Sequence, residues 1–490
     1  MLHTDSPILR RPFFYVIEGL VLTAVVTFAV VTGNLWLPLL VIAAVVGILF
    51  APTALPLVRQ LLGTIGRLEF AWLFVFIATM CVNTLTPDQV FSGGFGRAQL
   101  LRFGFLLLAL LLVLPNIIRW IRQESPGLWV GGLSKWFVAY AAFTLVSIVW
   151  SAGKLATFGK AFEMCVGLII VLAVAAQPDA ERKLKNLFVI TLSFVGMLLS
   201  FILVGYVVAP GEFTNYVLMA DSYTLTGGIF NMSGNLISRM GALIATVLLA
   251  YALQSGKSAS LRALAFAGIL FACVFPILAE GRTGIITFLL MLTLLLVSQR
   301  PLWSLPLFAG MAYVGLRYAQ DFYEFFRRGQ NDELFLSLSG RVGWWQAGLE
   351  TFLQEPLFGY GFGVGGRVVF ADIKGDVSGI HNGFLEVALG VGLVGLALWL
   401  PGFIGWLVLT LRELVRGHNT HIYCVGIPIL IATVLSQGVG GWMSFELGLF
   451  FIVTVLLDKE RANERRRRAS AQRKLSTGSL KPLSARPAHT

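Results

Sequence analysis

The sequence predicts an all-α polytopic membrane protein. Of its 490 residues, 57% are hydrophobic and only 13% are charged, and the mean hydropathy is +0.81. This composition lies far from that of soluble globular domains. Apolar runs of about 17–25 residues recur along the chain, which is the length that an α-helix needs to cross a hydrocarbon core of about 30 Å. Strands of a membrane barrel would be shorter and would alternate apolar with polar residues.

The apolar runs predict about 12–14 spans, including a first run that follows Arg10 and Arg11 and lacks the cleavage site of a signal peptide. The candidate spans are 13–32, 36–57, 69–85, 98–118, 135–150, 159–176, 187–208, 236–253, 262–279, 283–298, 302–318, 383–410, 422–436 and 442–457. We expect N-terminal membrane helices over 1–318, a large outer loop over 319–381, C-terminal membrane helices over 382–458 and a tail over 459–490. The four cysteines fall in separate apolar runs, so we expect buried thiols rather than disulfides.

Basic residues predict the orientation, because Lys and Arg are retained on the cytoplasmic side. One alternating set of connecting segments holds about 25 of the 37 Lys and Arg residues: 1–12, 59–68, 119–135, 177–186, 254–262, 299–301, 411–421 and 458–490. We assign this set to the cytoplasm together with both termini. The segments 209–235 and 319–381 then lie outside, in the periplasm if the membrane is a bacterial inner membrane.

The C-terminal tail from Lys459 is rich in Arg, Ser and Pro and low in apolar residues. Such a composition cannot bury a core, so it predicts disorder. The arginines favour contact with anionic lipid over a nucleic-acid partner.

Four of the arginines on the predicted outer side, where the positive-inside bias should have removed them, are of interest: Arg239, Arg282, Arg341 and Arg367. A guanidinium is permanently charged and holds phosphate oxygens in a bidentate fork, so arginines at this depth favour a lipid-linked phosphate or diphosphate ligand. Alternatively, each arginine reaches lipid headgroups or pairs with a neighbouring acid.

Arg341 opens a segment whose apolar residues recur at helical spacing, between Gly340 and Pro356. We expect a helix here that lies along the membrane surface. His381 stands at the start of the next apolar helix, and a neutral imidazole there could take a proton from a hydroxyl. Asn382 and Glu386 share a face of that helix and could orient a sugar. Alternatively, His381 only satisfies the N-terminus of the helix.

The glycine run from Gly359 to Gly366 contains a G-x-G-x-x-G pattern but lacks the βαβ surroundings of a dinucleotide site, so we interpret it as a close-packed turn. The outer acidic residues are scattered without ligand spacing, and no H-x-x-x-H or C-x-x-C occurs. The sequence therefore predicts neither a metal nor a cofactor.

The motifs E-G-R-T-G (280–284), G-R-V-G-W-W-Q (340–346), E-P-L-F-G-Y-G-F-G (355–363) and H-N-G-F-L-E (381–386) together resemble the superfamily of O-antigen ligases, O-antigen polymerases and exopolysaccharide polymerases. The resemblance covers roughly Gly227 to Leu400. It implies a fold similar to multi-span lipid-linked glycosyltransferases (GT-C-like). The implied activity is a metal-independent, inverting transfer of a glycan from undecaprenyl pyrophosphate on the outer face of the inner membrane.

The resemblance also implies roles for individual residues. Arg282 and Arg341 match arginines thought to hold the pyrophosphate, and His381 matches the histidine proposed to activate the acceptor hydroxyl. Arg239 and Asn235 resemble an N-x-x-x-R motif of exopolysaccharide polymerases. The residues before Asn235 are Met-Ser-Gly, where those members often carry His-Lys before the Asn.

Three functions stay open at this stage. A polymerase would use another lipid-linked repeat as acceptor, in concert with a chain-length-control protein, and a ligase would use the lipid A-core. A transporter or flippase of a lipid-linked or anionic substrate would place its binding groups at broken helices near the membrane midplane. The polar groups here gather near one membrane edge, which favours an enzyme.

Overall fold

The computed structural model describes residues 63, 65–80, 97–217, 222–230, 232–327, 329–370, 379–441 and 443–478. In chain order the longer helices before the segment 319–381 are α3 (Arg67–Met80), α5 (Arg97–Ile121), α6 (Ser134–Val146), α7 (Lys154–Ala175), α8 (Ala180–Val208), α10 (Gly234–Leu253), α11 (Ala259–Leu278), α12 (Arg282–Gln299) and α13 (Pro301–Arg317). After that segment come α18 (Gly383–Arg416), α19 (Thr420–Tyr423), α20 (Gly426–Leu435) and α21 (Phe445–Gly478).

The protein is an all-α polytopic membrane protein, as predicted. Within the described residues, seven helices are long and apolar enough to cross a membrane. Each expected span from 69–85 onward has a helical counterpart, whereas 13–32 and 36–57 lie outside the described residues. Several helices begin before the apolar run; α8, for example, starts at Ala180 rather than at 187. Hydropathy marks only the part of a helix in hydrocarbon, and the polar first turns extend beyond it.

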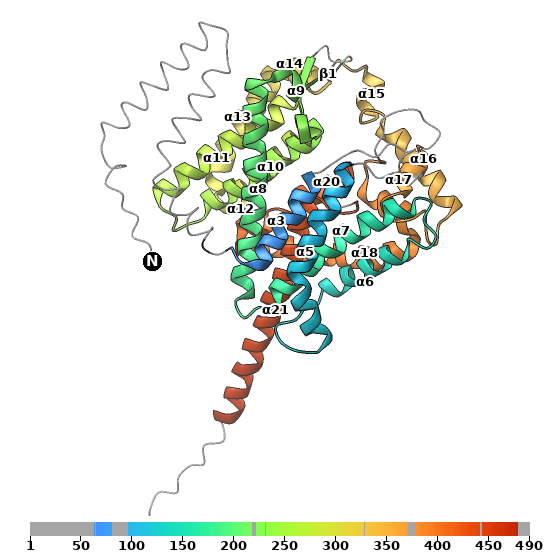
Figure 1. The fold of residues 1–490 in the computed structure, drawn as a ribbon. Coiled ribbons are helices and arrows are strands. Elements are labelled where there is room, and N and C mark those ends of the chain that lie inside the picture. Colours follow the sequence, from blue (N-terminus) through green and yellow to red (C-terminus); the bar gives the residue numbers. More distant parts are fainter. Residues whose placement is uncertain are drawn as a thin grey trace, which may run out of the picture.

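The segments 209–235 and 319–381, which we predicted to lie outside, carry the short elements. Between α8 and α10 lie α9 (Pro210–Phe213), the strands β1 (Thr214–Val217) and β2 (Ser222–Leu225), and the 3₁₀ turn η2 (Gly228–Phe230). The two strands pair antiparallel, Thr214 opposite Leu225. Between α13 and α18 lie α14 (Ala319–Arg327), α15 (Asp332–Leu336), α16 (Arg341–Gln354) and α17 (Gly365–Val368). In Figure 1 these elements lie at the opposite end of the bundle from the projecting part of α21.

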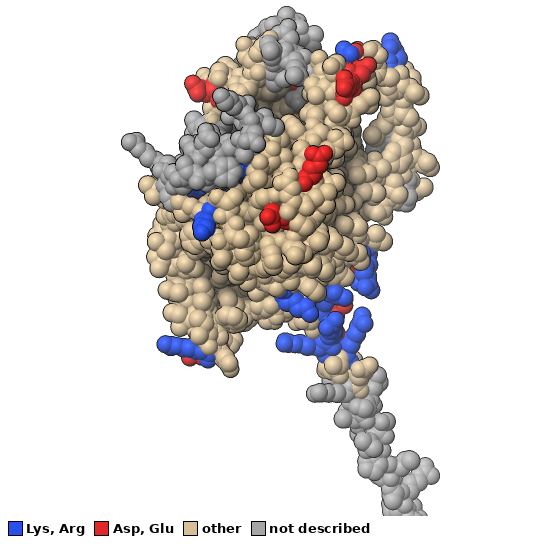
Figure 2. All heavy atoms as spheres, turned by 90° about the vertical axis from the view of Figure 1, so that its right-hand side faces the viewer, with Lys and Arg blue, Asp and Glu red and all other residues tan. Residues whose placement is uncertain are grey.

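Among the residues that the structure describes, several of the segments predicted to be cytoplasmic meet at one end of the bundle. The carboxylate of Asp458 accepts hydrogen bonds from the backbone N–H groups of Leu133 and Ser134, both at 2.8 Å. Glu460 accepts from the Tyr423 hydroxyl at 2.5 Å, and Asn463 donates to Glu181. Figure 2 shows Lys and Arg side chains gathered around the base of the projecting helix. We call this the basic end.

The C-terminal tail differs from the expectation of disorder from Lys459. Helix α21 continues without interruption to Gly478, and 479–490 lie outside the described residues. Arg, Ala, Glu, Gln and Lys are strong helix formers, and a helix already nucleated inside the bundle extends at little cost. Low hydropathy correctly indicated that these residues bury little, but it does not prevent a solvated helix.

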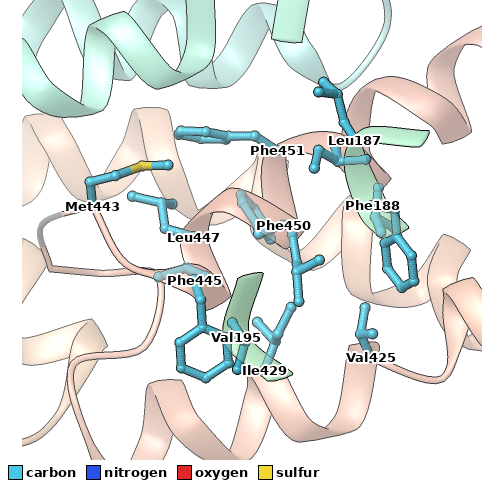
Figure 3. Packing of buried hydrophobic residues seen from close by; sticks show 14 of the residues in the cluster. Leu187, Phe188, Val195, Val425, Ile429, Met443, Phe445, Leu447, Phe450 and Phe451 are labelled. Carbon is cyan, nitrogen blue, oxygen red and sulfur yellow. The ribbon is translucent and has the colours of Figure 1, made fainter. Parts of the chain in front are cut away.

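The core of the bundle is built around α21. Its side chains Phe450 and Leu447 belong to one buried cluster with Leu187 and Val195 of α8 and Ile429 of α20 (Figure 3). Trp406 of α18 meets Phe450 with ring centroids 4.6 Å apart. Since lipid is as apolar as these side chains, close packing rather than water exclusion holds the helices together.

Helix α18 is interrupted at Gly392, whose backbone is left-handed (φ +65°). The glycine-rich turn inserts its backbone there: the N–H of Tyr360 donates to the carbonyl of Leu389, and that of Gly361 to Gly390, both at 2.8 Å. A Cβ at Gly359 would stand 2.5 Å from the carbonyl oxygen of Leu389. The glycines therefore allow backbone to approach backbone, which confirms the interpretation as a close-packed turn.

Candidate functional site

Small residues bring the starts of α10 and α12 together. The Ser238 hydroxyl donates to the carbonyl of Gly281 at 2.8 Å, and a Cβ at Gly284 would lie 2.1 Å from the Ser238 oxygen. This contact fixes the positions of the next residue on each helix, Arg239 on α10 and Arg282 on α12. Both lie at the end of the bundle opposite the basic end.

Arg239 is partly buried and pairs with a buried acid. Its Nε donates to the Oε1 atom of Glu446 on α21 at 3.1 Å. Glu446 is an acid within an apolar run of the sequence, and in the structure Arg239 is its partner. Asn235 lies one turn earlier on α10 and is half-buried.

Arg341 is the first residue of α16, whose bounds confirm the predicted helix and whose N-cap is Gly340. Its Nη1 atom donates to the carbonyl of Leu435, at the end of α20, at 2.7 Å. Among the described residues no carboxylate forms an ion pair with it. Burial lowers the pKa of Arg341, and the charge of Arg239 lowers it further. The two guanidinium groups are therefore close enough for their charges to act on each other, and a bound anion would relieve that repulsion.

His381 lies near these two arginines, and we call Arg239, Arg341 and His381 together the His381 group. Its backbone is left-handed (φ +53°), which is uncommon for a residue other than glycine and concentrates at functional sites. Its ring lies 5.5 Å from the ring of Trp344 on α16. Burial, followed by the charges of Arg341 and Arg239, lowers the pKa of His381 from 6.5 to about 4. The imidazole is therefore neutral near pH 7 and can accept a proton.

Glu386 and Asn382, either of which could orient a sugar, hold the backbone around His381. The Glu386 side chain accepts from the backbone N–H of Ile380 at 3.0 Å and from Nε2 of Gln437 at 3.1 Å. Glu386 is only 6% exposed. The Asn382 oxygen accepts from the N–H of Leu385 and caps α18. Their oxygens accept hydrogen bonds within the protein, and contact of either residue with a sugar stays a prediction.

Arg367 does not join the His381 group. It is 4% exposed and donates to the carbonyl of Gly363 at 2.8 Å. Burial lowers its pKa, Glu386 opposes this, and Arg102 adds to it. Arg102 in turn pairs with Glu163. Arg367 thus belongs to a buried charged cluster inside the bundle, behind the glycine turn.

Arg282 donates three hydrogen bonds to the segment that leads into α16. It donates to the carbonyl of Arg327 at 3.0 Å and to the Gln330 side chain at 2.9 Å. A third bond reaches the Ser339 hydroxyl at 3.3 Å, two residues before Arg341. Its charge is not among those that act on His381. The structure therefore connects Arg282 to the His381 group through Ser339 and α16.

Three supporting residues had no assigned role in the sequence analysis: Trp344, Gln437 and Glu446. Glu446 is an acid within an apolar run, and Gln437 is a polar residue between two runs, so each carried a local signal. Nothing local marks Trp344 as the ring beside His381. Within the described residues no three His, Cys, Asp or Glu side chains lie close enough to hold a metal ion; the metal-independent reaction stays a prediction.

Comparison with known families finds a match within this chain. Residues 267–400 match a family model described as O-antigen ligase. The matched segment contains Arg282, Arg341 and His381, whereas Asn235 and Arg239 precede it. This confirms the resemblance seen in the motifs and supports an O-antigen ligase or polymerase type of membrane glycosyltransferase. A search of curated proteins finds no match.

Proposed function

We propose that this chain, whose residues 267–400 match the O-antigen ligase family, transfers a glycan from undecaprenyl pyrophosphate to an acceptor hydroxyl. The observation that carries the proposal is the convergence of Arg239, Arg341 and His381 from three separate connections. Two cations and a neutral base in one partly buried place suit a reaction that moves a proton from a hydroxyl and expels a diphosphate.

In the proposed step the His381 imidazole accepts the proton of the acceptor hydroxyl. The acceptor oxygen attacks the anomeric carbon from the face opposite the diphosphate, and the bond from that carbon to the diphosphate oxygen breaks with its electron pair. The configuration is therefore inverted. Arg341 and Arg239 stabilise the charge that gathers on the departing diphosphate, so the stabilisation is greatest in the transition state.

Binding of the donor should also make the His381 imidazole a stronger base. In the free protein two guanidinium charges help to hold the pKa of His381 at about 4, which makes the imidazole a weak base. A bound diphosphate places negative charge against those guanidinium groups and offsets their effect. The pKa of His381 then rises toward 6.5, closer to the value at which a general base works best near neutral pH.

The acceptor distinguishes two versions of the proposal. We favour polymerisation of exopolysaccharide or O-antigen repeats, because the N-x-x-x-R residues Asn235 and Arg239 resemble polymerases and Arg239 lies at the His381 group. A polymerase would work with a chain-length-control protein. The alternative is a ligase that transfers the glycan to the lipid A-core.

The rival proposal of a transporter or flippase rested on broken helices. Helix α18 is indeed interrupted at Gly392, but the glycine turn already satisfies the carbonyls of Leu389 and Gly390. The break is therefore closed by the protein's own backbone rather than open to a substrate. This contact favours the enzyme.

We further propose that the site faces the periplasm in the inner membrane, with both termini in the cytoplasm. The support is the separation of the His381 group from the basic end, which gathers the segments rich in Lys and Arg (Figure 2).

The test is transfer by the purified full chain, with a lipid-linked glycan as donor and EDTA present. His381→Ala and Arg341→Ala should lower the rate about 10²–10³-fold, the magnitude seen when one transition-state donor is removed. Arg317→Ala, at the end of α13 on the same side, is the matched control and should retain activity. Full activity of either site variant would remove that residue from the mechanism.

Gene deletion then separates the alternatives. Loss of long polymer with short lipid-linked repeats remaining indicates a polymerase. Core lipid without glycan and accumulation of lipid-linked polymer indicate a ligase. Accumulation of lipid-linked repeats on the cytoplasmic side would indicate a flippase and would contradict the proposal.

A further inference from the structure

A second cavity lies far from the His381 group, between α8, α10 and α11, which lie side by side in Figure 1. It is a groove of about 470 Å³, within the range of small-molecule sites. Its walls are apolar and include Phe188, Leu192, Leu248 and Phe271. Val189, also on its lining, is 46% exposed. These helices are candidate membrane spans, so the groove would open toward lipid.

Two glycines, Gly196 and Gly268, line the groove, and Gly196 leaves open space there. A Cβ on Gly196 of α8 would have only one neighbour within 4 Å, the tip of Ile244 at 4.0 Å. Gly268 of α11 faces the flexible side chain of Leu248, whose Cδ1 atom would lie 2.6 Å from an added Cβ. A larger residue at Gly196 would therefore project into the groove without meeting backbone.

One end of the groove is charged. Lys185 lines it, next to Tyr251 and His421. The ammonium of Lys257 lies 4.3 Å from the centre of the Tyr251 ring. Both lysine charges act on the His421 imidazole, so the two ammonium groups lie near the same end. Gln254 also hydrogen-bonds to His421 there at 2.7 Å.

The nearest acids are held elsewhere. The charges of Lys185 and Glu181 both act on Glu460, but Glu460 accepts from Tyr423 and Glu181 accepts from Asn463. Among the described residues neither Lys185 nor Lys257 forms an ion pair. The end of the groove therefore presents two lysines beside an apolar channel.

We infer that this groove binds a phospholipid with an anionic headgroup, its acyl chain between α8, α10 and α11 and its phosphate at Lys185 and Lys257. An apolar channel ending in cations at the membrane boundary matches the chemistry of such a lipid. The site is separate from the proposed donor site. On α10 alone, Arg239 and Tyr251 are twelve residues apart, about 18 Å along the helix.

The test uses a photoreactive phosphatidylglycerol and the purified full chain in nanodiscs of equal phosphatidylglycerol and phosphatidylethanolamine. Cross-linked peptides should map to 185–196, 244–251 or 261–271, and lipids that copurify should be enriched in the anionic species. Cross-links confined to other helices would overturn the inference. If residues 13–57 of the same chain occupy the groove in place of lipid, no cross-link will map to it. That result would also overturn the inference.

Two variants separate the chain from the headgroup. Gly196→Leu fills the groove and should lower cross-linking at least several-fold. The control is Gly104→Leu on α5, where an added Cβ has no neighbour within 4 Å, and it should leave cross-linking unchanged. Lys185→Gln combined with Lys257→Gln should abolish the preference for the anionic lipid. The control is Lys183→Gln, two residues from Lys185 and near Asp179 instead. Equal lipid binding by wild type and Gly196→Leu, or an unchanged preference after loss of both lysines, would contradict the inference.

Discussion

Replacing Arg341 with Gln should raise the pKa of His381. Burial is the largest cause of the fall from 6.5 to about 4, and the charges of Arg341 and then Arg239 follow. The Gln variant keeps most of the burial and removes the larger of the two charges. We therefore expect the pKa to rise only part of the way, by about one pH unit, which corresponds to about 1.4 kcal/mol.

The assay is acylation of His381 by diethyl pyrocarbonate, which reacts with neutral imidazole. The chain has five histidines, so peptide mass spectrometry must follow His381 itself. At pH 5 an imidazole of pKa 4 is about 90% neutral, whereas one of pKa 5 is about 50% neutral. The midpoint of the rate should move upward by about one pH unit in Arg341→Gln. It should also move upward in wild type when lipid-linked diphosphate is bound.

The matched control is Arg282→Gln, because the charge of Arg282 does not act on His381. Its midpoint should stay at the wild-type value. An unchanged midpoint in Arg341→Gln, or an equal rise in Arg282→Gln, would refute the electrostatic argument. In the wild-type enzyme, kcat/KM reports the pKa of His381 in the free protein, so it should fall on acidification with a midpoint near pH 4. The value of kcat reports the donor complex, so it should fall with a midpoint at higher pH.

Three further substitutions test the architecture, each by thermal unfolding of the purified protein. Gly361→Ala should lower the unfolding temperature, because φ at Gly361 is +106° and the new Cβ would lie 2.2 Å from the Ser151 oxygen. The control Gly104→Ala should leave the unfolding temperature unchanged, and equal effects of the two substitutions would contradict the packing argument. Asp458→Ala removes the acceptor of two backbone N–H groups and should cost about 2–3 kcal/mol; no loss would show that these N–H groups find other partners. Glu386→Gln removes a buried carboxylate beside Arg367 and should cost about 3–5 kcal/mol, and wild-type stability would show that this charge is not needed there.

Much of the fold follows from local sequence. Apolar length alone predicted a helix for each described span, because every helix in a bilayer must satisfy its own backbone hydrogen bonds. The start of α16 at Arg341 followed from Gly340 and the helical spacing after it. The continuation of α21 beyond Lys459 did not follow from hydropathy, which reports burial rather than helix formation.

The candidate site, like the fold, followed partly from the sequence and partly from the tertiary structure. The sequence by itself determined which residues carry charge where few charges belong, and so it selected Arg239, Arg282, Arg341 and Arg367 together with His381. Only the tertiary structure decided which of them act together, because the distance between two side chains depends on how their helices pack. It brings Arg239 and Arg341 to His381, makes Arg282 a brace through Ser339, and encloses Arg367 behind the glycine turn with Glu386.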